Sequence, residues 1–350
     1  MLAEQEGGVL KDTLSLKLRM FPLVRALVSS RISGRPLFLS HLITTRCNCR
    51  CPMCLWRDEG HYQEMSAAEI GSFYRDSRHH GFVQVGIWGG EPLLREDLGE
   101  ILYHARRAGL FTVLLTNGYY LKERLEELTP YLDSIILSLD YAGKEHDRMR
   151  GCPGLFERVI SAMETLRRFY PHLNVSFNCL LHRGNEDQII SLAKLAEQLK
   201  VSFFVCPVKT EAVPGSGNRV EEWKSDSFHE KRISLQLKAL KRKGYPLNNS
   251  YTYLQEFLNE KNPYTCHLPK ISLMVYPDGK VVNCLDRSTP LGNVRRQSVG
   301  EILKSPGYGE LKNKALSCNH CNNPNVVDSS FLWELRRESW INAIKVLLKR

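Results

Sequence analysis

Three closely spaced cysteines are the residues of this chain best suited to chemistry: Cys47, Cys51 and Cys54, with three and two residues between them. Soft thiolates suit iron–sulfur clusters, and these clusters are usually held by four of them. A set of three on one tight loop can hold three corners of a four-iron cluster, which leaves the fourth iron free to bind another molecule. Cys49 lies in the same loop, but its spacing places it outside this ligand set.

The composition, with 43% hydrophobic and 25% charged residues, is that of a soluble globular protein. Residues 1–17 are polar and charged and lack the apolar core of a signal peptide, so we expect a cytoplasmic protein. Disulfides are rare in that compartment, and the eleven cysteines more often bind metal there. No run reaches the ~18 consecutive apolar residues that span a bilayer.

The net charge of +10 is concentrated at the two ends of the chain, with +5 in residues 1–50 and +3 in residues 329–350. A nucleic-acid enzyme more often spreads basic charge around a groove, so we expect no nucleic-acid partner. Each end is expected to form an amphipathic helix, the first from about Pro22. Basic helices of this kind suit peripheral contact with an anionic membrane, although the same pattern is more often that of a helix packed on its own domain.

The elements around the cysteine loop alternate between strands and helices. Expected strands cover residues 38–44, 83–88, 112–116, 134–139, 174–180 and 201–205. Expected helices cover residues 66–80, 96–108, 121–132, 154–169 and 186–199. This alternation predicts an α/β fold with a parallel sheet and right-handed crossovers. Six units are too few for an eightfold barrel, so we predict a partial (β/α)6 TIM-like barrel.

The rest of the chain departs from this alternation and divides it into segments. The expected segments are a basic amphipathic extension (1–35), the partial barrel (36–207), a connecting segment (208–262), a small α+β domain (263–327) and a C-terminal amphipathic helix (328–350). Within them we expect a charged helix over 228–243 and a single final helix over 330–350. The turn-forming residues 277–280, between apolar runs 271–276 and 281–284, predict a hairpin.

Polar and glycine-rich motifs follow several of the expected barrel strands. They are Gly89-Gly90-Glu91 after the second strand, Asn117-Gly118 after the third, Ser138-x-Asp140 at the end of the fourth, and Asn178 on the fifth. In barrels the reactive loops lie at the carboxyl ends of the strands. The cysteine loop and these motifs are therefore expected to converge on one mouth, although Asn117 has the simpler interpretation of a turn residue.

Over residues 36–207 these motifs, in this order, resemble those of the radical S-adenosylmethionine (SAM) superfamily. The resemblance implies that Cys47, Cys51 and Cys54 hold a [4Fe-4S] cluster that binds SAM. It also implies that a one-electron donor such as flavodoxin or ferredoxin reduces this cluster. Cleavage of the sulfonium then gives a 5′-deoxyadenosyl radical, which abstracts a substrate hydrogen. The cofactor carries this chemistry, while the protein supplies orientation and excludes water.

The resemblance also implies a set of residues that contact SAM. These are Gly89, Gly90 and Glu91 at the methionyl amine, Ser138 and Asp140 at the ribose, Arg150 at the methionyl carboxylate, and Asn178 on the fifth strand. A carboxylate can accept from an amine, and a planar guanidinium matches a carboxylate. The family often has an aromatic residue where this chain has Met53, which we expect to pack against the cofactor. No general base can be named from the sequence.

A second set of cysteines resembles the SPASM/Twitch auxiliary-cluster module: Cys266, Cys284, Cys318 and Cys321. Twelve residues separate Cys266 from Gly279, and four separate Gly279 from Cys284. No cysteine follows Cys321, so the shorter Twitch form with one auxiliary [4Fe-4S] cluster is the closer match. Four thiolates would leave no open iron, which favours electron transfer or a structural role. A zinc site with the same ligands is the alternative.

The substrate class stays open at this stage. A small molecule or lipid is favoured because only about 35 residues precede the first strand, with no obvious peptide-recognition domain. Maturation of a ribosomal peptide or protein is the alternative enzymatic function. A zinc-stabilised binding protein without enzymatic activity is the third hypothesis.

Overall fold

A nine-stranded sheet runs through the part of the chain that the structure, a computed structural model, describes. The strand order is β6-β5-β4-β3-β2-β1-β7-β8-β9. The described residues are 28–56, 60, 62–208, 222–223, 227–256, 264–282, 289–319 and 321–348. Six of its nine strands are those expected for the partial barrel.

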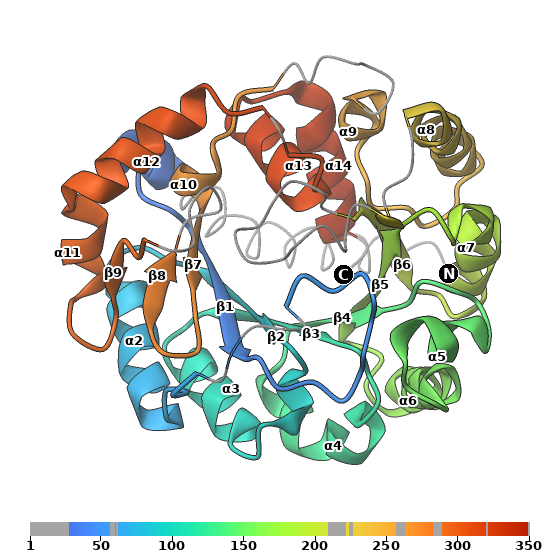
Figure 1. Cartoon of the computed structure of the whole chain (residues 1–350), viewed down its shortest axis with the longest axis horizontal. Coiled ribbons are helices and arrows are strands. Elements are labelled where there is room, and N and C mark those ends of the chain that lie inside the picture. Colours follow the sequence, from blue (N-terminus) through green and yellow to red (C-terminus); the bar gives the residue numbers. More distant parts are fainter. Residues whose placement is uncertain are drawn as a thin grey trace, which may run out of the picture.

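The first six strands form the parallel sheet that the sequence predicts. They are β1 (Phe38–Thr44), β2 (Gln84–Gly89), β3 (Phe111–Thr116), β4 (Ser134–Ser138), β5 (Asn174–Leu181) and β6 (Ser202–Pro207). Each pairs in parallel with the next strand in the chain. Figure 1 shows the sheet curved and open, so the prediction of a partial barrel is confirmed.

Helices follow the strands and cover the outer face of the sheet (Figure 1). They are α2 (Ala67–His79), α3 (Leu98–Arg107), α4 (Leu121–Leu128), α5 (Glu145–Arg150), α6 (Leu155–Phe169) and α7 (Ile189–Gln198). Ser66 caps α2 in a capping box with Glu69. The short helix α5 was not expected, and it is the element that carries Arg150.

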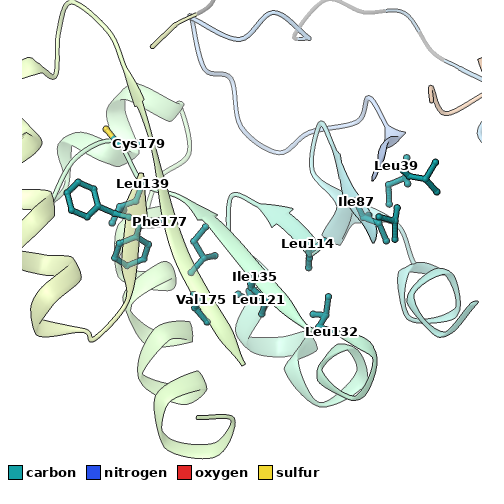
Figure 2. Packing of buried hydrophobic residues seen from close by; sticks show 14 of the residues in the cluster. Leu39, Ile87, Leu114, Leu121, Leu132, Ile135, Leu139, Val175, Phe177 and Cys179 are labelled. Carbon is teal, nitrogen blue, oxygen red and sulfur yellow. The ribbon is translucent and has the colours of Figure 1, made fainter. Parts of the chain in front are cut away.

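The hydrophobic core lies between this helical layer and the sheet (Figure 2). Alternate residues of each strand point to opposite faces, so Leu39, Ile87, Leu114 and Ile135 are buried against the helices. Residues on the other face include Ser40, Gly86, Ser138, Asn178 and Phe204, which are all half-buried. The inner face of the curved sheet is thus lined partly by small and polar side chains and is not filled as a core.

The small C-terminal unit extends the same sheet. After α10 (Leu268–Ile271), β7 (Ser272–Val275) pairs in parallel with β1, and it forms the predicted hairpin with β8 (Lys280–Val282). β9 (Gly292–Asn293) completes the edge. The hairpin was predicted, but its parallel pairing with β1 was not, because a strand's partner more than two hundred residues away leaves no local signal.

Five helices complete the unit and the connection to it: α8 (Ser227–Arg242), α9 (Tyr251–Glu256), α11 (Val299–Lys304), α12 (Pro306–Leu316) and α13 (Pro324–Trp333). Of these, α8 agrees with the predicted charged helix. The prediction of one final helix over 330–350 is wrong, since α13 ends and α14 (Arg337–Leu348) begins separately. Leu335 has a left-handed φ of 61°, which breaks the helix there. The chain has no glycine or proline at this point, so the break is invisible in the sequence.

The expected N-terminal helix lies mainly outside the described residues. Its described part, residues 28–33, is helical. The C-terminal helices are packed on the domain, because Phe331 is fully buried and Trp340 Nε1 donates to the carbonyl of Leu332 (3.1 Å). Within the described part of the chain, no helix is both long and apolar enough to cross a membrane.

Candidate active site

The cysteine loop directly follows β1 and is folded into tight turns. The Cys54 N–H donates to the Cys51 carbonyl (3.2 Å), and the thiol sulfurs of Cys47 and Cys54 accept from backbone N–H groups two residues on (3.4 Å each). Cys47 is exposed, Cys51 and Cys54 are half-buried, and Cys49 is buried. The three cysteines expected to bind metal are therefore those with accessible thiols.

Hydrogen bonding and burial give the neighbouring thiols different pKa values. Hydrogen bonds to Cys47 and Cys51, together with burial, raise the pKa of Cys49 well above its ordinary range. The same hydrogen bond to Cys49 lowers the pKa of Cys51 to about 7. Burial raises the pKa of Cys54 to about 11, so this thiol is protonated at neutral pH. Among the neighbouring thiols, Cys49 therefore holds its proton most tightly.

One anchor of the loop is a pair of asparagines. The Asn117 side chain donates to Asn48 Oδ1 (2.8 Å), and the Asn48 amide contacts Cys152 Sγ (3.7 Å). Asn117 Oδ1 also accepts from the Tyr119 N–H (2.9 Å), as in an Asx-turn. Asn117 therefore does more than make a turn, because it bonds the end of β3 to the cysteine loop.

A second anchor is the end of α5. The Arg50 N–H donates to the Arg150 carbonyl (2.8 Å), and the Cys51 thiol lies 3.8 Å from the same oxygen. Gly151, which ends α5 with φ 57°, lies against the loop, where an added Cβ would come 3.2 Å from Arg50 Cβ. Glycine suits this position because it tolerates both the left-handed backbone and the close approach.

Arg150 and Asp140, both expected to bind the cofactor, bond each other. Arg150 Nε and Nη2 donate to Asp140 Oδ2 (2.8 and 2.7 Å), and Asp140 Oδ1 accepts from the Leu180 N–H (2.8 Å). Asp140 is fully buried and the Arg150 side chain is 12% exposed. This pair joins the ends of β4, β5 and α5, and Nη1 of Arg150 is left to donate to another acceptor.

The carboxylate of Glu91 bonds the ends of β2 and β3. Its Oε1 accepts from the Leu93 N–H (3.0 Å) and the Thr116 hydroxyl (2.6 Å), and its Oε2 accepts from the Asn117 N–H (2.7 Å). Glu91 is fully buried, and burial raises its pKa. A carboxylate oxygen can accept twice, so Oε2 keeps capacity for one further donor such as an amine.

The glycines before Glu91 are required by the chain's own backbone. An added Cβ would lie 2.2 Å from the Thr44 carbonyl oxygen at Gly89 and 2.2 Å from the Arg46 carbonyl oxygen at Gly90. The N–H groups of Gly90 and Glu91 donate to these two carbonyls (2.8 Å each). The resemblance placed these glycines at the methionyl amine of SAM, and the close approach seen in the structure is to Thr44 and Arg46, which lead into the cysteine loop.

Ser138 and Asn178 face each other across β4 and β5 on the inner face of the sheet. Asn178 Oδ1 is buried and, among the described residues, has no hydrogen-bond partner. An unsatisfied buried acceptor costs about 1–3 kcal/mol, and a hydroxyl group of a bound molecule could satisfy it. This observation supports Asn178 as a contact of a polyhydroxyl ligand such as a ribose.

The sequence analysis missed His182, which follows β5 and is fully buried. Its Nδ1 accepts from the Gly184 N–H (3.0 Å), and its Nε2 has no partner among the described residues. Burial lowers the pKa of His182, so the ring is neutral and Nε2 carries the proton. Trp223, from the connecting segment, lies on the ring at 5.3 Å between centroids. A lone histidine after a strand gave no signal in the sequence.

An apolar cluster covers the cysteine loop. Met53 and Val208 are its buried members, and the partly buried members are Cys51, Leu55, Met149, Leu180 and Trp223. In this structure Met53 packs against these side chains. The cluster brings the connecting segment, through Trp223, over the end of the sheet where the loop lies.

The second cysteine set is only partly within the described residues. The Cys266 N–H donates to the Cys318 carbonyl (3.3 Å), and the Tyr264 hydroxyl accepts from the Cys321 N–H (3.0 Å). Burial, and then the charges of Cys321 and Cys266, raise the pKa of Tyr264. The structure thus joins the segments that carry Cys266, Cys318 and Cys321, without placing three potential metal ligands together among the described residues. Cys284 lies outside the described residues.

Cys206 lies at the end of β6, on the side of the barrel that meets the second cysteine set. Burial, and then the charge of Cys321, raise the pKa of Cys206 to about 12. Cys152 and Cys179 are also buried, as expected for small core residues.

Two family models match this chain in the order that the motifs predict. The radical SAM superfamily model matches residues 42–196, which contain the cysteine loop and the strand-end motifs. The chain is a radical SAM protein. A second model, the SPASM iron–sulfur cluster-binding domain, matches residues 266–322 of this radical SAM protein and ends one residue after Cys321.

Several solved structures have a similar fold. SuiB from Streptococcus suis, bound to S-adenosylmethionine, is 19% identical with a TM-score of 0.68, and the match covers 92% of this chain and 82% of that one. The enzyme anSMEcpe, with bound AdoMet and the Cp18Cys peptide, is 15% identical with a TM-score of 0.61, and the match covers 89% and 98%. At these identities the likeness shows the fold.

The two domains determine the cofactors and the class of protein. A radical SAM domain binds SAM at a [4Fe-4S] cluster, and a SPASM domain binds auxiliary iron–sulfur. The chain is therefore a radical SAM enzyme, and the hypothesis of a binding protein without enzymatic activity is set aside.

Proposed function

We propose that Cys47, Cys51 and Cys54 hold the SAM-binding cluster at the carboxyl end of β1. The observation that carries this proposal is the attachment of their loop to the end of β3 through Asn117 and to the end of α5 through the Arg150 carbonyl. These anchors would hold the three thiols over the inner face of the sheet. Residues of three other strand ends surround this position, so one molecule there can touch them together.

We propose that SAM lies across these strand ends. Glu91 Oε2 would accept from its amine, and Arg150 Nη1 would donate to its carboxylate. Asn178 Oδ1, with Ser138 beside it, would bind the ribose, while Gly89, Gly90 and Asp140 shape the site through their bonds to its neighbours. When bound, the cluster and SAM supply a 5′-deoxyadenosyl radical that abstracts a substrate hydrogen.

The protein's part is to orient SAM and the substrate and to exclude water from the site. The neutral, buried His182 is placed to donate through Nε2, and Trp223 and Met53 close the side of the loop. Excluding water strengthens each of the polar contacts and protects a reactive species from quenching. His182 cannot serve as a general base through Nε2 while that nitrogen carries the proton.

We propose that Cys266, Cys284, Cys318 and Cys321 hold one auxiliary [4Fe-4S] cluster. Its support is the backbone bond between Cys266 and Cys318 and the domain match over residues 266–322, which contain all four cysteines. Full ligation by thiolates leaves electron transfer or structure as its role. Residues 36–207 and 263–327 would then be the initiating and auxiliary domains, joined by 208–262 and flanked by 1–35 and 328–350.

We propose a peptide or protein segment as the substrate. The sequence favoured a small molecule or lipid, but two similar folds were solved with peptides: SuiB with the precursor peptide SuiA (TM-score 0.66, 18% identity, covering 85% and 74%) and anSMEcpe with the Cp18Cys peptide. The half-buried, partly polar inner face of this sheet could receive an extended chain.

The substrate class can be tested with the reconstituted enzyme and peptides encoded beside its gene. A mass change that needs both SAM and a strong reductant, and that the Cys51→Ala variant does not produce, would support the proposal. Turnover of a lipid or metabolite extract with no change in any such peptide would contradict it and return the substrate to the small-molecule class.

We also propose a cytoplasmic enzyme that receives its electron from flavodoxin or ferredoxin. In support, the cysteines within the described residues form no disulfide, as in a reducing compartment. Peripheral membrane contact through the terminal segments belongs to the same proposal. Trp340, however, is held inward by its bond to Leu332, so the C-terminal helices offer little support for it.

A further inference from the structure

A cavity of about 400 Å³ lies at the opposite end of the barrel from the cysteine loop. Its polar lining comes from the segment before β1, the end of α2, and α11 and α12: Arg35, His79, His80, Lys304, Tyr308 and Lys312. The segments that precede β1 and β2 lie at the amino ends of these strands, whereas the cysteine loop follows β1. The cavity is therefore separate from the candidate active site.

Three positively charged side chains line this cavity, and no described acidic side chain pairs with them. Arg35, Lys304 and Lys312 form no ion pair with any described residue, and no carboxylate lines the cavity. Lys312 Nζ lies 5.5 Å from the centroid of the buried Tyr308 ring, which fixes one of the three charges at the wall. Like charges that share a concave surface repel each other and attract a multivalent anion. A phosphate group fits this need better than a carboxylate, since it carries more charge and matches a guanidinium.

An exposed apolar face adjoins the basic cavity. Val28 and Ile32, one helical turn apart on residues 28–33, are 52% and 83% exposed. This helical segment is attached to the body, since the Ser30 hydroxyl lies 3.5 Å from the Lys270 carbonyl oxygen and the Arg31 guanidinium lies 5.6 Å from the centroid of the Trp333 ring. In Figure 1 the segment, in blue, lies beside α12 and α10. Its exposed apolar side chains are therefore held next to the cavity.

We propose that this face binds an anionic membrane lipid, with the phosphate headgroup in the cavity. Val28 and Ile32 would enter the boundary between headgroups and acyl chains. Amphipathic surfaces with basic residues beside apolar ones bind such membranes through electrostatic attraction to the headgroups and through burial of the apolar side chains. A soluble phosphate ester would account for the cations but not for the apolar face beside them. Binding in this way would turn the carboxyl ends of the strands, where the cysteine loop lies, away from the bilayer.

Co-sedimentation with vesicles tests this proposal on the full-length protein without SAM. The vesicles contain phosphatidylglycerol and phosphatidylcholine in equal parts, or phosphatidylcholine alone. The test variant replaces the three cavity cations: Arg35→Gln, Lys304→Gln and Lys312→Gln. The control variant removes the same charge from distant exposed positions: Arg168→Gln, Lys194→Gln and Lys243→Gln.

The wild type and the control should bind the anionic vesicles, and the test variant should bind them about a hundredfold more weakly, since each basic side chain contributes roughly fivefold. Ile32→Ser should weaken binding about tenfold through lost apolar burial, and Ile190→Ser on α7 should not. Circular dichroism checks that each variant is folded.

Equal weakening in both triple variants would overturn the proposal, because it would show a general charge effect. Failure of the wild type to bind anionic vesicles would also overturn it. Stabilisation of the wild type, but not the test variant, by sodium pyrophosphate in the absence of vesicle binding would assign the cavity to a soluble phosphate instead. None of these outcomes depends on SAM cleavage, so the proposed function can fail or stand separately.

Discussion

The two cysteine sites of this protein are positioned by different means. The initiating set, Cys47 to Cys54, lies on one loop that is folded by its own turns. Side-chain and backbone bonds to the ends of β3 and α5 then hold the whole loop as a unit. The described members of the auxiliary set come from two segments, with Cys266 before α10 and Cys318 and Cys321 after α12.

The bonds found at the auxiliary set run between these segments. Cys266 bonds the Cys318 carbonyl through its backbone, and Tyr264 bonds the backbone of Cys321. The initiating site is thus formed within one loop, which is then bonded to the ends of β3 and α5. The auxiliary site forms only when its separate segments have folded together. We therefore expect local changes to separate the two sites functionally, with one lost and the other kept.

The largest effect is expected from Cys51→Ala, which removes a ligand of the initiating cluster. SAM cleavage should fall to background, because three thiolates are the minimum for the site. The auxiliary iron should remain. The rate of 5′-deoxyadenosine formation measures the effect, and Cys49→Ala, which changes a thiol outside the set, is the matched control. Loss of cleavage in the control and not in Cys51→Ala would reverse the ligand assignment.

A smaller effect is expected from Asn117→Ala, which cuts the bond to Asn48 and frees one side of the loop. Loss of such an outer contact typically lowers metal-site activity about 10- to 100-fold. Iron content should be kept, since no thiol is removed. The control is Asn174→Ala. Asn174 lies at the amino end of β5, away from the cysteine loop, and its amide donates to the Ser134 hydroxyl (3.2 Å). Equal rates in the two variants would mean that the loop needs no anchor at β3.

At the auxiliary site, Tyr264→Phe should have a moderate effect on stability and little effect on SAM cleavage. It removes one hydrogen bond to the Cys321 N–H, which is worth about 1 kcal/mol. For a chain of this size the melting temperature should fall by about 2–4 °C. A fall in SAM cleavage as large as that of Asn117→Ala would show that the auxiliary site is coupled to initiation.

The smallest effect concerns Asp328 on α13, where burial raises the pKa to about 7. The folded state therefore binds this proton more tightly than the unfolded state. The resulting stabilisation is fully present below the ordinary carboxyl pKa and is lost as pH rises through about 7. The melting temperature should fall over this range, and less so in Asp328→Asn. Identical pH profiles would show that the carboxyl of Asp328 does not titrate in this window.

Much of the barrel could be predicted because its signals are local. The six strands and their helices follow from alternating apolar runs, and the cysteine spacing stands within one loop. The parallel pairing of β7 with β1 could not be predicted, since it depends on packing across the whole chain. The break at Leu335 was hidden for a similar reason, because tertiary contacts outweigh the helical propensity of the surrounding residues.

The site itself was predicted in position more than in detail. The strand-end motifs do meet around the cysteine loop, as their order implied. The sequence could not show that Asp140 pairs with Arg150, or that Glu91 already accepts three hydrogen bonds. His182 was missed because its burial and its unpartnered Nε2 are properties of the fold.

The central claim, that one loop holds a complete initiating site separate from the auxiliary one, is tested most directly by iron content and electron paramagnetic resonance. The wild type should hold about eight irons after anaerobic reconstitution, and the variant with Cys47, Cys51 and Cys54 all changed to alanine should hold about four. Addition of SAM should change the reduced-cluster spectrum of the wild type only. A variant that keeps all its iron and still responds to SAM would contradict the account.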